Sequence, residues 1–251
     1  MRDLLEACKV TMKLAFRNWQ VNYFLKKETG PKVREIAEFG YSHRIGLLSI
    51  NECQIIQSAI DELIDNDNYS WCDYLKSDYR IYEAENKINL SWLDDRLADA
   101  NKIATKFHSQ EYVYTDLIAR VRYTEGNLGS GGGWHRDSLL PQFKTIIYLC
   151  DAKKSNGAFE IIPLSHKTRN TIVLNATTDH QAKDRRFADD FIVSTFDDIL
   201  TLEGAAGDQL FVNTNSIHRG RPLQSGQRYA LTRYYFNNVA DKQRFLDCLQ
   251  R

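Results

Sequence analysis

The spacing of hydrophobic residues changes near residue 110 of this 251-residue chain, and this change limits the folds open to it. Before residue 110, apolar residues recur every three to four positions, which places them on one face of a helix. After it, short segments rich in β-branched and aromatic residues alternate with turns, the pattern of strands. We therefore expect a single domain, 1–251, in which a mainly helical part (1–110) packs against a β core (111–240).

Three helices are predicted in the first part of the chain. Ser49 and Glu52 form a capping box that begins the second helix, and Ser91 opens the third. The apolar stripes are Leu5, Cys8, Met12, Phe16 and Trp19 in the first helix (residues 4–25), Cys53, Ile56, Ile60 and Leu63 in the second, and Leu93, Leu97, Ala100, Ala104 and Phe107 in the third.

Five strands are predicted in the second part, at 117–124, 144–150, 158–162, 209–214 and 228–236. Asn156-Gly157 is a strong signal for a tight turn between two of them. Residues 175–198 are polar and densely charged without clear periodicity. We interpret them as a long insertion between strands and a candidate lid.

Charge and cysteine content exclude several classes of protein. Lys plus Arg (33) balances Asp plus Glu (33), so no global basic field attracts nucleic acid. The five cysteines are scattered and form no CxxC pair, which disfavours a disulfide framework and a structural zinc site and favours a reducing compartment. No apolar run reaches the length of about 18 residues that a transmembrane helix needs. We expect a cytoplasmic protein.

The N-terminal segment carries a local excess of positive charge. Residues 1–34 hold eight Lys or Arg against three Asp or Glu. Such a helix could bind a membrane surface peripherally. We favour a helix that packs on the core, because Phe16 and Trp19 suit a core equally well.

A candidate metal site begins at His135 and Asp137. Alternate residues of a strand point the same way, so the imidazole and the carboxylate would lie side by side. An HxD pair alone is weak evidence for a metal site, because a chain with six histidines contains such a pair by chance quite often. His218, at the end of another strand-like run, completes a set of two imidazoles and one carboxylate.

This ligand set is typical of non-haem Fe(II) oxygenases, in which three coordination positions stay open for a chelating cosubstrate and dioxygen. Catalytic zinc accepts the same ligands. Arg228 favours iron, because zinc ligands alone would not require a cationic anchor ten residues further on. The other histidines, His43, His108, His166 and His180, are interpreted as turn, surface or helix residues.

With these residues in place, the sequence resembles the phytanoyl-CoA dioxygenase family of Fe(II)- and 2-oxoglutarate-dependent oxygenases over roughly residues 36 to 238. The resemblance rests on order and spacing. After the HxD pair come Lys144-Thr-Ile-Ile-Tyr-Leu149, Asn156-Gly157, Ile162-Pro-Leu-Ser-His-Lys167, Gly207-Asp-Gln-Leu-Phe-Val212, His218 and Gly226-Gln-Arg-Tyr-Ala-Leu231. The stretch from Phe39 to Glu52 is similar to the family's first helix.

The resemblance implies a double-stranded β-helix, a jelly-roll or cupin-like fold of the α+β, mainly β class, with the N-terminal helices packed against it. It implies that His135, Asp137 and His218 hold Fe(II) and that Arg228 pairs with the far carboxylate of 2-oxoglutarate. Thr232 and Lys144 are weaker candidates for contacts with this cosubstrate, and Tyr148 for the pocket wall.

The implied reaction is O2-dependent hydroxylation of an unactivated C–H bond of a small molecule, with release of succinate and CO2. Desaturation and ring formation remain open. The alternative is a jelly-roll scaffold that binds metal without turnover, or a metal enzyme that does not use 2-oxoglutarate. Two departures from the family pattern stand out: Leu164 replaces a glycine in a turn, and Arg219-Gly220-Arg221 lacks a small hydroxyl residue after the second histidine.

Overall fold

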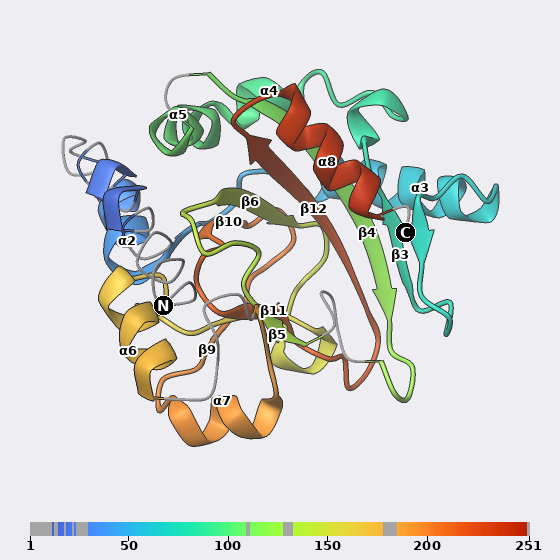
Figure 1. Cartoon of the computed structure of the whole chain (residues 1–251). Helices are drawn as coiled ribbons and strands as arrows, with labels where there is room; N and C mark the ends of the chain where they lie inside the picture. Colours follow the sequence, from blue (N-terminus) through green and yellow to red (C-terminus); the bar gives the residue numbers. More distant parts are fainter. Residues whose placement is uncertain are drawn as a thin grey trace.

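The computed structural model describes residues 12, 15–17, 19–21, 23, 30–108, 111–127, 133–177 and 185–249. Two antiparallel sheets form its centre (Figure 1). The larger sheet consists of β1 (Tyr41–Arg44), β2 (Trp71–Cys72), β3 (Asp78–Ile81), β4 (Val113–Arg122), β6 (Phe143–Tyr148), β10 (Gln209–Asn213) and β12 (Gln227–Phe236). The smaller sheet consists of β5 (Trp134–His135), β7 (Phe159–Ile161), β8 (Arg186–Phe187), β9 (Leu200–Leu202) and β11 (His218–Gly220).

The strand orders are β1-β10-β6-β12-β4-β3-β2 in the larger sheet and β8-β5-β11-β7-β9 in the smaller. From β4 to β7 and again from β9 to β12, successive strands lie in different sheets, so the chain passes back and forth between the two layers. This is the double-stranded β-helix that the sequence predicts, and it confirms the expected mainly β fold with added helices.

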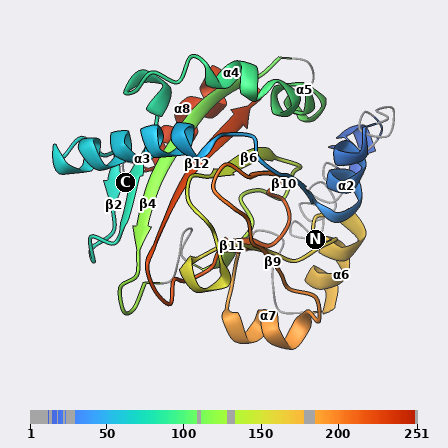
Figure 2. The same ribbon diagram turned by 180° about the vertical axis from the view of Figure 1, so that it is seen from behind.

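Helices cover the outer face of the larger sheet. These helices are α2 (Pro31–Phe39), α3 (Ile50–Asp65), α4 (Leu93–Arg96) and α5 (Ala98–Phe107). Three more helices, which are not part of this layer, follow later in the chain: α6 (Thr168–Thr177), α7 (Asp189–Thr195) and α8 (Val239–Leu249). Figure 2 shows α3 in front of the larger sheet. Ile56 of α3, Phe107 of α5 and Leu231 of β12 are almost fully buried in one apolar core. No helix among the described residues is long and apolar enough to span a membrane.

The second and third predicted helices are present. At α3 the Ser49 hydroxyl accepts from the Glu52 amide (3.2 Å), and the Glu52 carboxylate accepts from the Ser49 amide (2.7 Å), so the capping box is confirmed. The third helix is divided at Leu97 into α4 and α5. Its predicted stripe is nevertheless completely or almost completely buried.

The prediction for the N-terminal helix is only partly confirmed. Residues 1–11 lie outside the described residues, and those described between 12 and 23 are helical. Met12, Phe16 and Trp19 are 71%, 59% and 60% exposed, so the expectation that this stripe packs on the core is wrong for these three. Val21, at 3% exposed, is buried instead. The exposed rings contact one another instead, and Phe16 stacks on Trp19 at 6.0 Å between centroids.

All five predicted strands exist, as β4, β6, β7, β10 and β12. The stretch from Phe39 to Glu52, expected as one helix, instead contains the end of α2, all of β1 and the start of α3. Gly40, with φ of 92°, ends α2 and permits this reversal. Asn156-Gly157 does form a turn, but it joins the two sheets and is not a hairpin between paired strands.

Part of the candidate lid belongs to the β core. Residues 178–184 lie outside the described residues. On either side are the end of α6, then β8 and α7, and β8 pairs with β5 so that Arg186 lies opposite His135. A moving lid therefore stays a prediction, and the described segment beside it is an edge strand of the smaller sheet.

Candidate metal centre

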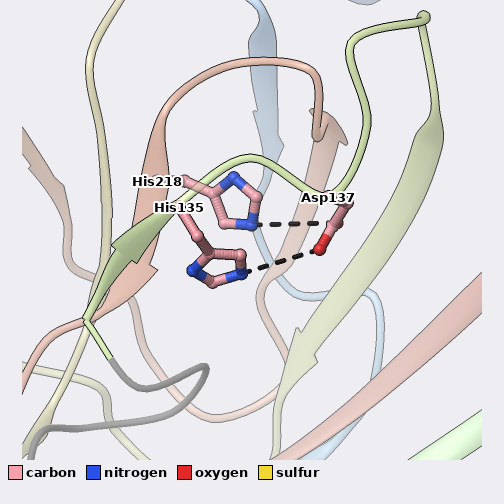
Figure 3. A group of neighbouring side chains, drawn as sticks. All are labelled: His135, Asp137 and His218. Atoms are coloured by element: carbon pink, nitrogen blue, oxygen red, sulfur yellow. Dashed lines mark ion pairs between the residues drawn. The ribbon is translucent and has the colours of Figure 1, made fainter. Parts of the chain in front are cut away.

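His135 and His218 lie on adjacent strands, β5 and β11, directly opposite one another in the register. Their ring centroids are 4.5 Å apart. Asp137 follows β5 in a bend, so the expectation that it shares a strand face with His135 needs correction. The bend is held by the Asp137 amide, which donates to the Thr214 carbonyl at 3.1 Å. Figure 3 shows the carboxylate turned toward both imidazoles.

Both imidazoles are oriented by backbone carbonyls. The Nδ1 of His135 lies 2.9 Å from the Gly133 oxygen, and the Nδ1 of His218 lies 2.9 Å from the Ser216 oxygen. A carbonyl can only accept, so each Nδ1 carries the proton and each Nε2 presents its lone pair to the site. The two Nε2 atoms lie 3.6 and 3.8 Å from the Asp137 carboxylate. One ligand atom from each residue lies within 4.8 Å of the others, so the donor set fits a divalent metal ion.

The Asp137 carboxylate is kept ionised by its neighbours. Burial alone would raise its pKa, but the Lys144 ammonium, whose Nζ lies 2.5 Å from Oδ2, and the two histidines hold this pKa well below its usual value. Burial, with the neighbouring His135 acting in the same direction, lowers the pKa of His218 to about 3. A charged carboxylate and a neutral imidazole are the forms that bind metal.

The centre opens into a cavity of about 480 Å³ on the inner face of the larger sheet. Arg228, Ala230, Thr232 and Tyr234 alternate along β12 and all line this cavity, as strand alternation predicts for the first three. Lys144 and Tyr148 of β6 line it too. The Tyr148 hydroxyl is held by the backbone, because it donates to the Leu202 carbonyl (2.7 Å) and accepts from the Phe159 amide (2.9 Å).

Arg228 is buried at one end of the cavity, with 6% of its surface exposed. The turn at Gly157 lies directly against it, because a Cβ at Gly157 would come within 3.0 Å of the Arg228 guanidinium. Gly157 has a φ of 91° as well, so both its backbone conformation and the space around it require glycine. The Asn-Gly turn that the sequence analysis singled out thus covers the cationic end of the cavity.

Sequence reasoning missed several residues that line the cavity: Trp71, Arg80, Tyr82, Arg186, Tyr234 and Phe245. Tyr234 could have been found, since it continues the alternation from Arg228. The others come from the two-residue strands β2 and β8, from the short strand β3 and the residue after it, or from α8, and no local pattern marks them.

The structure shows how the chain accommodates its two departures from the family pattern, at Leu164 and at Arg219-Gly220-Arg221. Leu164 adopts a φ of +63°, so the turn keeps the conformation that favours glycine although a leucine occupies it. Gly220 lines the cavity, whereas its neighbours Arg219 and Arg221 both pair with the buried Glu160, at 2.7 and 2.5 Å. These arginines fasten β11 to β7 and do not replace the missing hydroxyl in the cavity.

Comparison with solved structures shows the same fold at low sequence identity. The epimerase SnoN, in complex with Fe3+, alpha ketoglutarate and nogalamycin RO, superposes with a TM-score of 0.61 at 17% identity and covers 89% of both chains. The carbocyclase SnoK from nogalamycin biosynthesis gives 0.61 at 18% identity, covering 84% of this chain and 85% of that one. HygX from Streptomyces hygroscopicus, with nickel, 2-oxoglutarate and hygromycin B bound, gives 0.59 at 16% identity, covering 84% and 88%.

No curated protein matches the sequence. Residues 36–230 do match a family, the one described as Phytanoyl-CoA dioxygenase (PhyH). This match includes strands of both sheets, up to the start of β12, and every residue of the metal centre. With the double-stranded β-helix and the convergent His-Asp-His set, it shows that the chain belongs to the phytanoyl-CoA dioxygenase family.

Proposed function

We propose that this protein is an Fe(II)- and 2-oxoglutarate-dependent oxygenase that hydroxylates an unactivated C–H bond of a small molecule. The observation that carries the proposal is the convergence of His135, Asp137 and His218 at a cavity that has a buried arginine at one end. Bound Fe(II) would supply the redox chemistry by which O2 oxidises 2-oxoglutarate to succinate and CO2 and oxidises the substrate.

The residues of the chain would bind, orient and shield the reactants. His135, Asp137 and His218 would hold the metal on one side and leave the cavity side open. The Arg228 guanidinium would pair with the far carboxylate of 2-oxoglutarate, and Thr232, four residues along the same strand face, would add a hydroxyl contact. Burial of Arg228 excludes water, which strengthens such a charged hydrogen bond.

The type of oxidation is the finer part of the proposal. The similar structures include an epimerase and a carbocyclase, so this fold supports outcomes other than hydroxylation. Asp137 supports an oxygenase and not a halogenase, because the carboxylate would occupy the position where a halide would bind the metal.

The test is an anaerobic Fe(II) titration with 2-oxoglutarate, followed by the weak visible charge-transfer band of a chelated keto acid. We expect the band in the wild type, its loss in His135→Ala, and a raised 2-oxoglutarate requirement in Arg228→Ala. His43→Ala and Arg122→Ala are matched controls, since His43 lies on β1 and Arg122 is exposed at the end of β4. A folded protein that binds Fe(II) but shows no band would support the scaffold or the non-oxoglutarate alternative.

A further inference from the structure

Lys144 occupies an unusual position for a lysine. It is 6% exposed, on β6, and its Nζ lies 2.5 Å from Asp137 Oδ2 and 3.9 Å from the centroid of the Tyr234 ring. Burying an ammonium group is unfavourable unless anions or aromatic rings surround it. Asp137 is its only carboxylate partner among the described ion pairs, and that carboxylate is also a metal ligand in the proposed function.

Lys144 lies far from the residue that would anchor 2-oxoglutarate. Tyr234 pairs with Lys144 in the register of β12 and β6, and Arg228 is six residues away from Tyr234 along β12. At about 3.3 Å per residue, the two backbone positions are separated by roughly 20 Å. Arg228 and Lys144 therefore enter the cavity from well-separated positions along β12 and β6, which favours different anionic partners for the two.

The charges of the proposed complex do not account for Lys144. Fe(II), Asp137, Arg228 and the dianion of 2-oxoglutarate together are neutral. Arg80, a further lining cation, is held by Asp78 at 2.7 Å. Lys144 then adds a positive charge next to a metal ligand, which repels the metal unless another anion enters the cavity. Arg186 also lines the cavity, opposite His135 in the register of β8 and β5.

The cavity wall next to Lys144 is aromatic. Tyr234, whose ring faces the Lys144 ammonium, contacts Phe245 of α8 at 4.9 Å between ring centroids, and Phe245 contacts Tyr82 at 5.8 Å. All three rings line the cavity. The helix that supplies Phe245 is fastened to the rest of the chain by Lys242, which pairs with Glu85 at 3.1 Å. An apolar group placed beside Lys144 would therefore rest on α8.

We infer that the substrate is a small organic acid with an apolar or aromatic body, whose anionic group binds Lys144 and whose body packs on Tyr234 and Phe245. This inference rests on the proposed function, because it places the acid in the part of the cavity that the metal and 2-oxoglutarate leave open. The carboxylate would supply the missing negative charge and would orient the body against the aromatic wall.

The test uses three probes with the same phenylpropyl body and different charge: phenylpropionate, its isosteric amide phenylpropionamide, and the cation phenylpropylamine. Their affinities are measured by calorimetry on the full chain loaded with Zn(II) and 2-oxoglutarate, and by the shift of the Fe(II)–2-oxoglutarate band under anaerobic conditions. We expect phenylpropionate to bind at least tenfold more tightly than the amide and the amine. Lys144→Met should abolish this preference, and Phe245→Ala should weaken all probes while preserving it.

Lys87→Met is the matched control, because Lys87 bonds Asn68 on the surface, away from the cavity. Lys144→Arg should restore part of the preference for the acid.

Three results would each overturn the inference: equal affinity for the three probes in the wild type, no binding of the acid, or an unchanged preference in Lys144→Met. So would a Lys144→Met variant that loses affinity for 2-oxoglutarate instead, since that result assigns Lys144 to the cosubstrate. If no Fe(II)–2-oxoglutarate band forms in the wild type, the proposed function fails, and the calorimetry with Zn(II) alone still measures the charge preference at Lys144.

Discussion

At Arg228 the shape of the cation is expected to matter as much as its charge. A guanidinium can donate two parallel hydrogen bonds to one carboxylate, whereas an ammonium offers a single point of contact on a shorter, flexible chain. We expect Arg228→Lys to raise the KM for 2-oxoglutarate about 10- to 100-fold, corresponding to the loss of one charged hydrogen bond. Succinate release at varied 2-oxoglutarate measures the effect, and a KM that stays at the wild-type value would contradict the anchoring role.

Leu164 is a second residue whose conformation makes a prediction. Its φ of +63° is unfavourable for a residue with a Cβ, and its side chain is 42% exposed, so little packing compensates. Leu164→Asn should leave the protein as stable as the wild type or more stable, by up to about 1 kcal/mol, because asparagine tolerates this conformation. Leu164→Val should destabilise by about 1 kcal/mol or more, because branching at Cβ worsens the clash. Urea unfolding compares them, and equal stability of the two variants would refute the strain.

At the scale of elements, the segments with a strong local pattern could be predicted and those fixed by distant partners could not. Long strands such as β4 and β12 carry their own β-branched and aromatic signal, and α3 carries its capping box. Strands of two residues, such as β2, β5 and β8, are too short for any periodicity and exist because a neighbour pairs with them. The helix α8 was not predicted for another reason: it follows the last predicted strand and lies outside the family resemblance.

The candidate site divides in the same way. His135, Asp137, His218 and Arg228 could be named because the order of motifs along the chain carries them. The rest of the cavity wall, beyond β6 and β12, could not, since Arg80 and Phe245 meet the site only through the register of the larger sheet and the packing of α8. Even the HxD pair reaches its geometry differently from the prediction, through a bend held by Thr214.

The loop before β10 makes a prediction about how elements are joined. The Gly207 carbonyl accepts from the amides of Leu47 (2.8 Å) and Leu48 (3.2 Å), which ties the start of α3 to the larger sheet. A Cβ at Gly207 would come within 2.0 Å of the Leu48 oxygen, and its φ is +91°. Gly207→Ala should therefore cost about 2–4 kcal/mol, the sum of backbone strain and a steric clash.

Gly226 provides the control for that variant. It also has a positive φ, +70°, but nothing lies within 4 Å of a Cβ built there. Gly226→Ala should cost only about 1 kcal/mol, from the backbone alone. Denaturant unfolding of both variants separates the two effects, and similar losses would show that the contact with Leu48 relaxes easily.

At the scale of the whole molecule, the two faces of the larger sheet have separate tasks. The outer face packs on α3, α4 and α5 in one apolar core, and the inner face lines the cavity of the metal centre. His108 lies at the end of α5, beside this outer core. Its Nδ1 lies 3.2 Å from the Asn237 side-chain oxygen, and its ring stacks on Tyr235, a core residue at the end of β12. His108 was expected to be a surface or a helix residue. It is 6% exposed and ends α5, so the surface expectation is wrong.

This buried histidine predicts how stability depends on pH. Burial lowers the pKa of His108 to about 4, the bond to Asn237 and the charge of Asp241 oppose this shift, and Arg17 adds to it. In the unfolded chain the pKa is about 6.5, so both states are neutral above that pH, and the unfolded state alone gains a proton below it. The free energy of unfolding should therefore fall as the pH drops from about 6.5 toward 4, by about 2 kcal/mol at pH 5.

His108→Gln removes this titration while every other group remains, so the loss of stability between about pH 7.5 and pH 5 should be about 2 kcal/mol smaller in the variant. Urea unfolding at the two pH values measures the difference, and parallel curves would mean that His108 is protonated as easily in the folded protein as in the unfolded chain.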